Sequence, residues 1–130
     1  MRKRVVAYVE RADGLLVFDH RDHPEAGTQV PAGGVLAGEE LLDAVHREVR
    51  EETGVLLNSR PTLLGTHEHA DGLGRQALSY FFRSAAPDGL PRSWDHVVEG
   101  DGGDAGLVFE CRFDGAPELW PVQAIFLDDG

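Results

Sequence analysis

Three glutamates stand close together in the middle of the chain. Glu48, Glu51 and Glu52 are spaced at i, i+3 and i+4, so on a helix their carboxylates project from neighbouring positions on one side. Like charges at this spacing repel and weaken a helix by roughly a few tenths of a kcal/mol per pair. This repulsion indicates a bound cation, and oxygen ligands without thiols suit a hard ion, Mg²⁺ or Mn²⁺.

The same spacing has a second explanation, because Glu-rich exposed helix faces are common. In that case the three acids form a solvated face, and Arg47 and Arg50 are their ion-pair partners. The spacing alone leaves both explanations open, so the surrounding residues have to decide.

The residues around the acids predict an amphipathic helix of about four turns over residues 39–53. This stretch contains neither glycine nor proline, and apolar side chains recur in it at helical spacing: Leu41, Leu42, Val45 and Val49. We expect Gly38 to be its N-cap and Gly54 to end it in the left-handed conformation. Glu39 and Glu40 complement the positive end of the helix dipole.

The order of residues from 33 to 55 resembles the Nudix box, G-x5-E-x7-R-E-U-x-E-E-x-G-U, in which U is aliphatic. The matching residues are Gly33, Glu39, Arg47, Glu48, Val49, Glu51, Glu52, Gly54 and Val55. An accidental match at every specified position has a probability on the order of 10⁻⁹ per register under average residue usage. The resemblance therefore favours the metal-site explanation over the solvated face.

The resemblance implies a Nudix fold of the α/β (α+β) class, with a mixed β-sheet sandwiched between helices and a catalytic loop-helix-loop. It also implies that water, with divalent-metal help, cleaves a pyrophosphate linkage in a nucleoside diphosphate joined to another group. Pyrophosphate is densely anionic, so an acidic site holds it only when metal ions bridge the carboxylates and the phosphate oxygens. The expected substrate is a small nucleotide derivative, such as a nucleoside di- or triphosphate or a nucleotide sugar.

The expected catalytic residues follow from the same resemblance. Glu48 and Glu52 are the first choice as metal ligands, and Glu51 completes the set directly or through water. Arg47 orients a glutamate and ties the helix to the preceding loop. One of these glutamates, or an acid from a later loop, takes the proton of the water.

Several other residues are candidates with weaker support. Gly33 and Gly34 are substrate-binding candidates that permit the tight backbone path from the loop to the helix, with an ordinary turn as the alternative. Arg21 is a candidate for binding the anion of the substrate. Glu39 serves either the helix dipole or the metal. Further candidates outside the box are His67, Glu68, His69, Trp94, Glu99, Asp101, Asp104 and Trp120. For each of these we weigh an ordinary role in the sheet, core or turns against a role in the site.

The rest of the chain predicts a β-rich domain around this helix. Residues 4–9 and 14–19 form a hairpin, because an Asp-Gly turn signal separates two β-rich runs. We expect further strands at 62–69, 75–84 and 106–113, and loops at 19–28, 86–92 and 99–106. Residues 119–127 are compatible with a strand or a short helix.

Length and charge set the limits. With 130 residues, the chain fits a single domain over 1–130. The 23 acidic and 12 basic residues give a net charge of −11, which disfavours polymeric nucleic acid and, weakly, inositol polyphosphates. The apolar run after the basic start ends at residue 9, so we expect a first strand, with neither a signal peptide nor a membrane span.

Localisation and assembly are less constrained. Cys111 is the only cysteine, which is typical of a reducing compartment, so a cytoplasmic protein is expected. The oligomeric state stays open, with a homodimer as one candidate. The alternative to an enzyme is a noncatalytic Nudix-like module that binds a nucleotide or acts as a sensor. Loss of box acids would mark such a module, and none is lost here.

Overall fold

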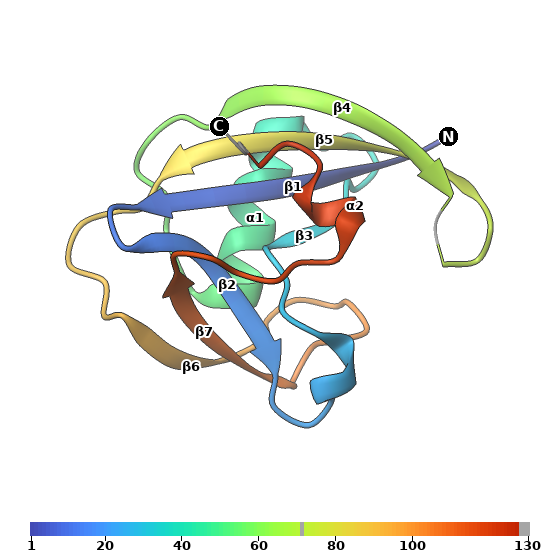
Figure 1. The fold of residues 1–130 in the computed structure, drawn as a ribbon. Coiled ribbons are helices and arrows are strands. Elements are labelled where there is room, and N and C mark those ends of the chain that lie inside the picture. Colours follow the sequence, from blue (N-terminus) through green and yellow to red (C-terminus); the bar gives the residue numbers. More distant parts are fainter. Residues whose placement is uncertain (71, 128–130) are drawn as a thin grey trace.

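The computed structural model describes residues 1–70 and 72–127 of the chain. These residues form seven strands in one mixed sheet, a long helix, a short helix and a 3₁₀ turn (Figure 1). The strands are β1 Arg2–Arg11, β2 Gly14–His20, β3 Ala32–Gly34, β4 Thr62–Ala70, β5 Gln76–Ala85, β6 Ser93–Val97 and β7 Val108–Asp114. The helices are α1 Leu41–Thr53 and α2 Pro121–Ala124, and the 3₁₀ turn is η1 Pro24–Ala26. No helix in this part of the chain is long and apolar enough to cross a bilayer.

The sheet has the order β4-β5-β1-β2-β7-β6, and only β1 and β5 run parallel to each other. Strands β1 and β2 pair only beside their hairpin, where Glu10 lies opposite Leu15 and Arg11 opposite Gly14. Farther along, β3 pairs with β1, placing Gly33 opposite Val5. The start of the box is therefore held in the middle of the sheet.

Both faces of the sheet are covered, because successive side chains of a strand point to opposite faces. On β1, Val5 and Val9 pack in the cluster that contains Val45 and Val49 of α1. The intervening Tyr8 packs on the other face with the C-terminal segment, which includes α2 (Figure 1). The predicted arrangement of a mixed sheet between helices is confirmed.

The predicted strands are confirmed with small shifts at their ends. The hairpin spans β1 and β2, and the runs at 62–69, 75–84 and 106–113 correspond to β4, β5 and β7. The expected loop at 19–28 begins later, because β2 continues to His20, and it contains η1. At the C-terminal end the short helix is the correct alternative, and Pro121, with its fixed φ, begins α2.

Strand β6 was not predicted from the sequence. Its residues are mostly polar, yet they alternate in exposure, with Trp94 and His96 turned inward. Alternation of this kind is the signal that a composition-based reading overlooks.

The start of the long helix differs from the prediction. Gly38 is not the N-cap: it adopts a left-handed φ of 75° in the preceding loop, and Glu40 is the N-cap. The difference arises because Glu39 is part of the loop, where its carboxylate accepts a 3.0 Å hydrogen bond from the Leu36 amide. The predicted end is confirmed, since Gly54 is left-handed and its amide donates to the Arg50 carbonyl over 2.8 Å.

Candidate active site

Helix α1 presents the box glutamates at its buried side, not to open solvent. Ala44, Val45 and Val49 are completely buried against the sheet. The side chains of Glu48 and Glu51 are only 12% and 15% exposed, respectively. The acidic cluster is therefore not a solvated face, although Arg47 is an ion-pair partner of Glu48 and Glu51, as that explanation expected.

Arg47 is the centre of the cluster. Its Nε donates to Glu39 over 2.8 Å, and its Nη1 donates to Glu48 and Glu51 over 2.6 and 2.9 Å. Its Nη2 donates to the Gly34 carbonyl and to Glu39 over 2.8 and 3.0 Å. The guanidinium carries five N–H groups in a rigid fork, so these five hydrogen bonds match its full donor set. Arg47 thereby joins the loop before the helix to the acids on it.

Glu52 faces a different partner. Its Oε1 accepts a 2.9 Å hydrogen bond from the amide of Ala32 on β3. Burial raises its pKa well above the usual range, and the charges of Glu48 and Asp104 add to the shift. Burial also raises the pKa of Glu48, while Arg47 opposes that shift. The acids of the cluster are thus buried and close enough together that ionisation of all of them at once is disfavoured.

Gly33 leaves the space that Glu48 occupies. A Cβ atom at position 33 would overlap the carboxylate of Glu48, and the backbone there is fixed by its pairing with β1. Gly33 is therefore required for close approach and not for an unusual φ. At Gly34, a Cβ atom would lie 3.0 Å from Nη2 of Arg2, so this arginine lies over the first turn of the box.

The loop after β6 packs against the end of the helix. The amide of Glu99 donates to the Glu51 carbonyl over 3.0 Å, and Nε2 of His96 lies 3.1 Å from the same oxygen. Gly100 approaches the Glu51 side chain so closely that a Cβ atom there would overlap its carboxylate. Of the predicted loop acids, Glu99 is thus held beside the box by its backbone. His96 and Gly100 were not anticipated, because their contacts depend on the unpredicted β6.

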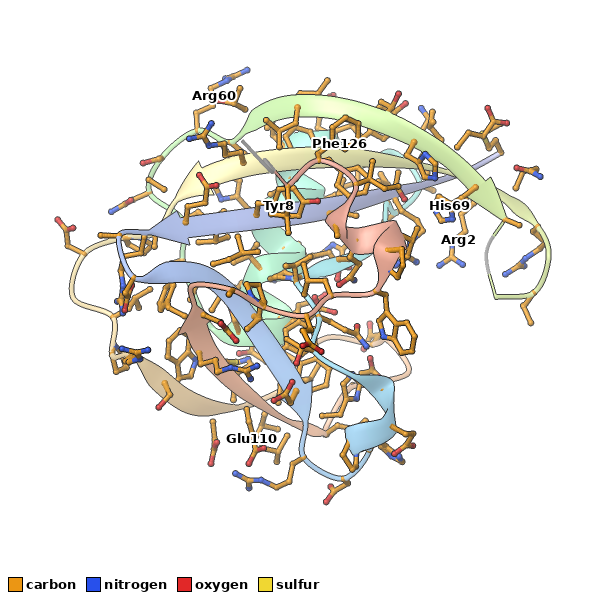
Figure 2. The ribbon with its side chains drawn as sticks, viewed as in Figure 1. Arg2, Tyr8, Arg60, His69, Glu110 and Phe126 are labelled. Carbon is orange, nitrogen blue, oxygen red and sulfur yellow. The ribbon has the colours of Figure 1, made fainter. Side chains whose placement is uncertain are left out.

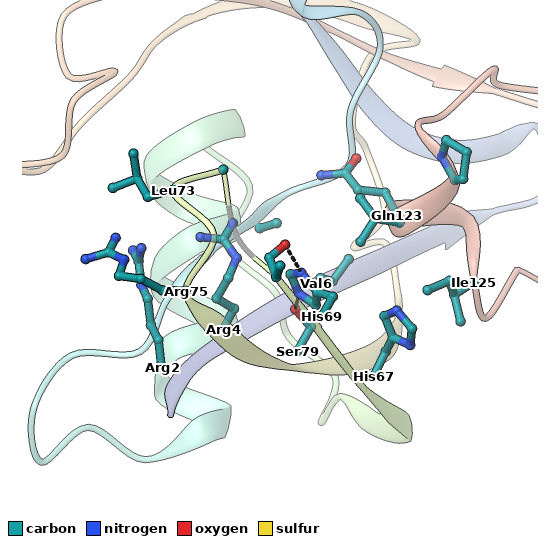
Figure 3. Close-up of a pocket in the computed structure, with 15 residues that line it drawn as sticks. Arg2, Arg4, Val6, His67, His69, Leu73, Arg75, Ser79, Gln123 and Ile125 are labelled. Atoms are coloured by element: carbon teal, nitrogen blue, oxygen red, sulfur yellow. Dashed lines mark hydrogen bonds between the residues drawn. The ribbon is translucent and has the colours of Figure 1, made fainter.

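A cavity of about 790 Å³ opens beside the box (Figure 3). Among the residues that line it are Arg2, Arg4, Ala32, His67, His69, Arg75, Ser79 and Gln123. His67 and His69 share one face of β4, as predicted, and their rings lie parallel with centroids 5.6 Å apart. The three arginines were missed: Arg2 and Arg4 lie together on β1, but Arg75 precedes β5 far along the chain, and no local pattern connects them.

Arg21 is not among the residues that line the cavity. It forms ion pairs with Asp95 and Glu110, and Glu110 lies at a different edge of the view in Figure 2 from Arg2 and His69. Its role in substrate binding stays a prediction from sequence.

The two tryptophans have structural partners. Trp94 Nε1 donates to the Thr53 carbonyl at the end of α1, over 2.8 Å. Trp120 is about half exposed and donates to the Ala26 carbonyl over 2.8 Å. Neither ring is among the residues that line the cavity.

Comparison with known proteins decides the family. Residues 1–120 match the family described as NUDIX domain. The chain belongs to the Nudix family. A comparison with curated protein sequences gives no match.

Solved structures agree with the Nudix assignment. The chain is 27% identical to a MutT NUDIX hydrolase from Burkholderia pseudomallei, with a TM-score of 0.69 over 95% of this chain and 93% of that one. A NUDIX hydrolase from Nitrosomonas europaea is 24% identical, with a TM-score of 0.61 over 87% of this chain and 72% of that one, and supports the fold. The protein is a Nudix pyrophosphohydrolase, and members of this family act on small nucleotide derivatives and generally use divalent metals.

Proposed function

We propose that this Nudix protein hydrolyses the pyrophosphate linkage of a nucleoside diphosphate joined to another group, using Mg²⁺ or Mn²⁺ held by Glu48, Glu51 and Glu52. The observation that carries the proposal is a buried carboxylate cluster directly beside a large cavity. Ala32 belongs to both, since it lines the cavity and its amide donates to Glu52. The proposal therefore places the diphosphate of the substrate at the Ala32 side of the cavity, next to Glu52.

The donor set fits a hard divalent ion. All three side chains offer carboxylate oxygens, which such ions prefer, and Gly33 leaves room for the Glu48 carboxylate. Among the described residues, no group of three or more Asp, Glu, His or Cys side chains is arranged so that it could hold a metal ion as it stands. Glu48 and Glu51 accept from Arg47, while Glu52 accepts from Ala32. Each of these hydrogen bonds uses Oε1 of its glutamate, so ion binding requires rotation of the carboxylate groups while Arg47 and Ala32 keep the side chains near one another.

The ion would supply polarisation of the phosphorus and a lower pKa for the attacking water. The protein supplies positioning. Arg47 fixes the directions of Glu48 and Glu51 by hydrogen bonds, and it ties them to Glu39 and the Gly34 carbonyl. Correct placement of reacting groups accounts for a large part of enzymatic rate enhancement.

The proton acceptor is one of the box glutamates or an acid of the later loop. Among the loop acids, Asp104 acts electrostatically on Glu52, whereas Glu99 lies 3.7 Å from His96. Asp104 is therefore the loop acid that the surroundings of Glu52 favour.

The test compares Glu52→Gln with the wild type on a panel of nucleotide derivatives in the presence and absence of Mg²⁺. We expect the variant to lose at least about a hundredfold in turnover, because an amide cannot replace the carboxylate on the ion. It should still fold, since the amide oxygen can accept from Ala32. Glu40→Gln is the matched control, because Glu40 is exposed and its side chain forms no capping hydrogen bond.

Two results would contradict the proposal. One is turnover by Glu52→Gln at the wild-type rate, and the other is wild-type turnover that a chelator leaves unchanged. Tight nucleotide binding by the wild type without any turnover would favour the noncatalytic module instead.

A further inference from the structure

The cavity beside the box is built on one face of three neighbouring strands (Figure 3). In the sheet register, Arg4 lies opposite Ser79, which lies opposite His67. One step along, Arg2 lies opposite Ala77, which lies opposite His69. Residues directly opposite in neighbouring strands share a face, so the two arginines and the two histidines form a continuous polar floor.

The charge of this floor is opposite to that of the protein. Three of the chain's 12 Lys and Arg residues, Arg2, Arg4 and Arg75, line one cavity of a protein with a net charge of −11. No Asp or Glu is among the described residues that line it. Figure 3 shows the three guanidinium groups gathered at one end of the cavity. A concentration of positive charge in an acidic protein indicates an anionic ligand.

The three cavity arginines lie at different distances from the chemistry. Arg4 is close enough to Glu48 and Glu52 for its charge to oppose the rise in their pKa. Arg2 lies over Gly34, and Figure 3 draws Arg75 on the same side of the cavity as Arg2. Arg4 is thus close enough to the box glutamates to contact the diphosphate that is cleaved. Arg2 and Arg75 are placed to contact a part of the substrate that lies farther from Glu48 and Glu52.

The remaining wall suits the organic part of such a ligand. Val122 and Ile125 of the C-terminal segment line the cavity, and Figure 3 shows Ile125 on the side away from the arginines. A volume of about 790 Å³ is within the usual range for small-molecule sites, roughly 300–1,000 Å³. The cavity therefore has room for a nucleoside together with a charged substituent.

We infer that Arg2 and Arg75 bind an additional phosphate group of the substrate, separate from the diphosphate that is cleaved. The preferred substrates then carry a further phosphate, either on the sugar or farther along the phosphate chain. Bidentate contacts between a guanidinium and phosphate oxygens provide the selectivity. This inference rests on the proposed function, because it places the cleaved diphosphate at the box glutamates.

The experiment measures binding to the Glu52→Gln protein, so that turnover does not interfere. One pair of ligands is ADP-ribose and ADP-ribose 2′-phosphate, which differ in a sugar phosphate. The second set is nucleoside mono-, di- and triphosphates of four bases, which differ in chain length. We expect the ligand with the additional phosphate to bind at least about tenfold more tightly in one of these arms, and the arm locates the phosphate.

Arg2→Gln and Arg75→Gln, introduced into the same protein, should remove most of that preference and leave the affinity for the partner ligand nearly unchanged. The control is Arg60→Gln, since Arg60 is exposed at the far end of the molecule from Arg2 (Figure 2). Equal affinity within both arms, no binding in either, or a preference that survives both substitutions would overturn the inference. Failure of the proposed function is a separate result: the wild type would show the binding preference without metal-dependent turnover.

Discussion

The carboxylate cluster and the arginine-lined cavity are neighbours, yet they are built in opposite ways. The cluster comes from one contiguous stretch and is held by the five hydrogen bonds of Arg47. The cavity gathers side chains from β1, β4, β5 and the C-terminal segment, and Arg2 and Arg75 are exposed. Internal hydrogen bonds therefore hold the groups proposed for the chemistry, whereas the side chains proposed for substrate selectivity are exposed to solvent.

This difference has an energetic reason. A misplaced catalytic group costs rate steeply, so positioning it by several hydrogen bonds is favourable. A recognition group gains most of its interaction from the ligand that it binds. Substitutions in the cluster should therefore lower turnover, and substitutions in the cavity should mainly change affinity.

Gly33→Ala tests the cluster most severely. The added Cβ would overlap the Glu48 carboxylate, and pairing of Gly33 with Val5 prevents the backbone from moving away. We expect kcat/KM to fall about a hundredfold, since displacement of a positioned group by about 1 Å has effects of this size. Overpacking should also reduce the free energy of unfolding by about 1–3 kcal/mol.

The control for this substitution is Gly103→Ala. A Cβ atom at position 103 meets nothing within 4 Å, and Gly103 has no left-handed φ. Activity of Gly33→Ala within twofold of this control would contradict the proposal that turnover depends on the exact position of Glu48.

Arg47→Lys should have the next largest effect. Lysine has a single ammonium and cannot reproduce the planar fork that reaches Glu39, Glu48, Glu51 and Gly34 together. We expect activity to fall at least about tenfold, in line with the loss of groups that orient ligands. Arg50→Lys on the same helix is the control, because Arg50 is exposed.

The same substitution has a consequence for pH. The hydrogen bond from Arg47 lowers the pKa of Glu39, so this interaction stabilises the fold above the ordinary glutamate pKa and is lost as pH falls through the lowered value. Urea unfolding of the wild type should show this loss under acidic conditions, and Arg47→Lys should show less of it. An unchanged pH profile in the variant would show that Arg47 does not hold Glu39 in solution.

His69→Ala should have the smallest effect, and it tests whether a residue of the cavity affects substrate binding without affecting turnover. His69 lies on β4, outside the box, and its Nε2 lies 2.8 Å from Ser79 Oγ in the cavity floor. We expect KM to rise by about a fewfold, consistent with loss of one neutral contact, while kcat stays within about twofold. Thr66→Ala, on the exposed face of the same strand, is the control. A large fall in kcat with unchanged KM would show that His69 takes part in catalysis. It would contradict the assignment of the cavity residues to binding alone.

The sequence determined the parts of this protein that depend on short-range geometry. Helical periodicity fixed the spacing of Glu48, Glu51 and Glu52, and Gly54 ended their helix as expected. The hairpin followed from two β-rich runs and an Asp-Gly signal, because neighbouring segments pair without help from distant ones. The box also indicated the family, since all its specified residues lie within 33–55.

Only the tertiary structure decided which distant residues meet. The contact of Gly33 with Glu48 and the reach of Arg47 to Glu39 and Gly34 depend on how the loop folds back onto the helix. The cavity depends on the parallel pairing that places Arg2 opposite Ala77. Such pairing joins segments far apart in the chain, and no local pattern encodes it because its stability comes from burial on both faces of the completed sheet.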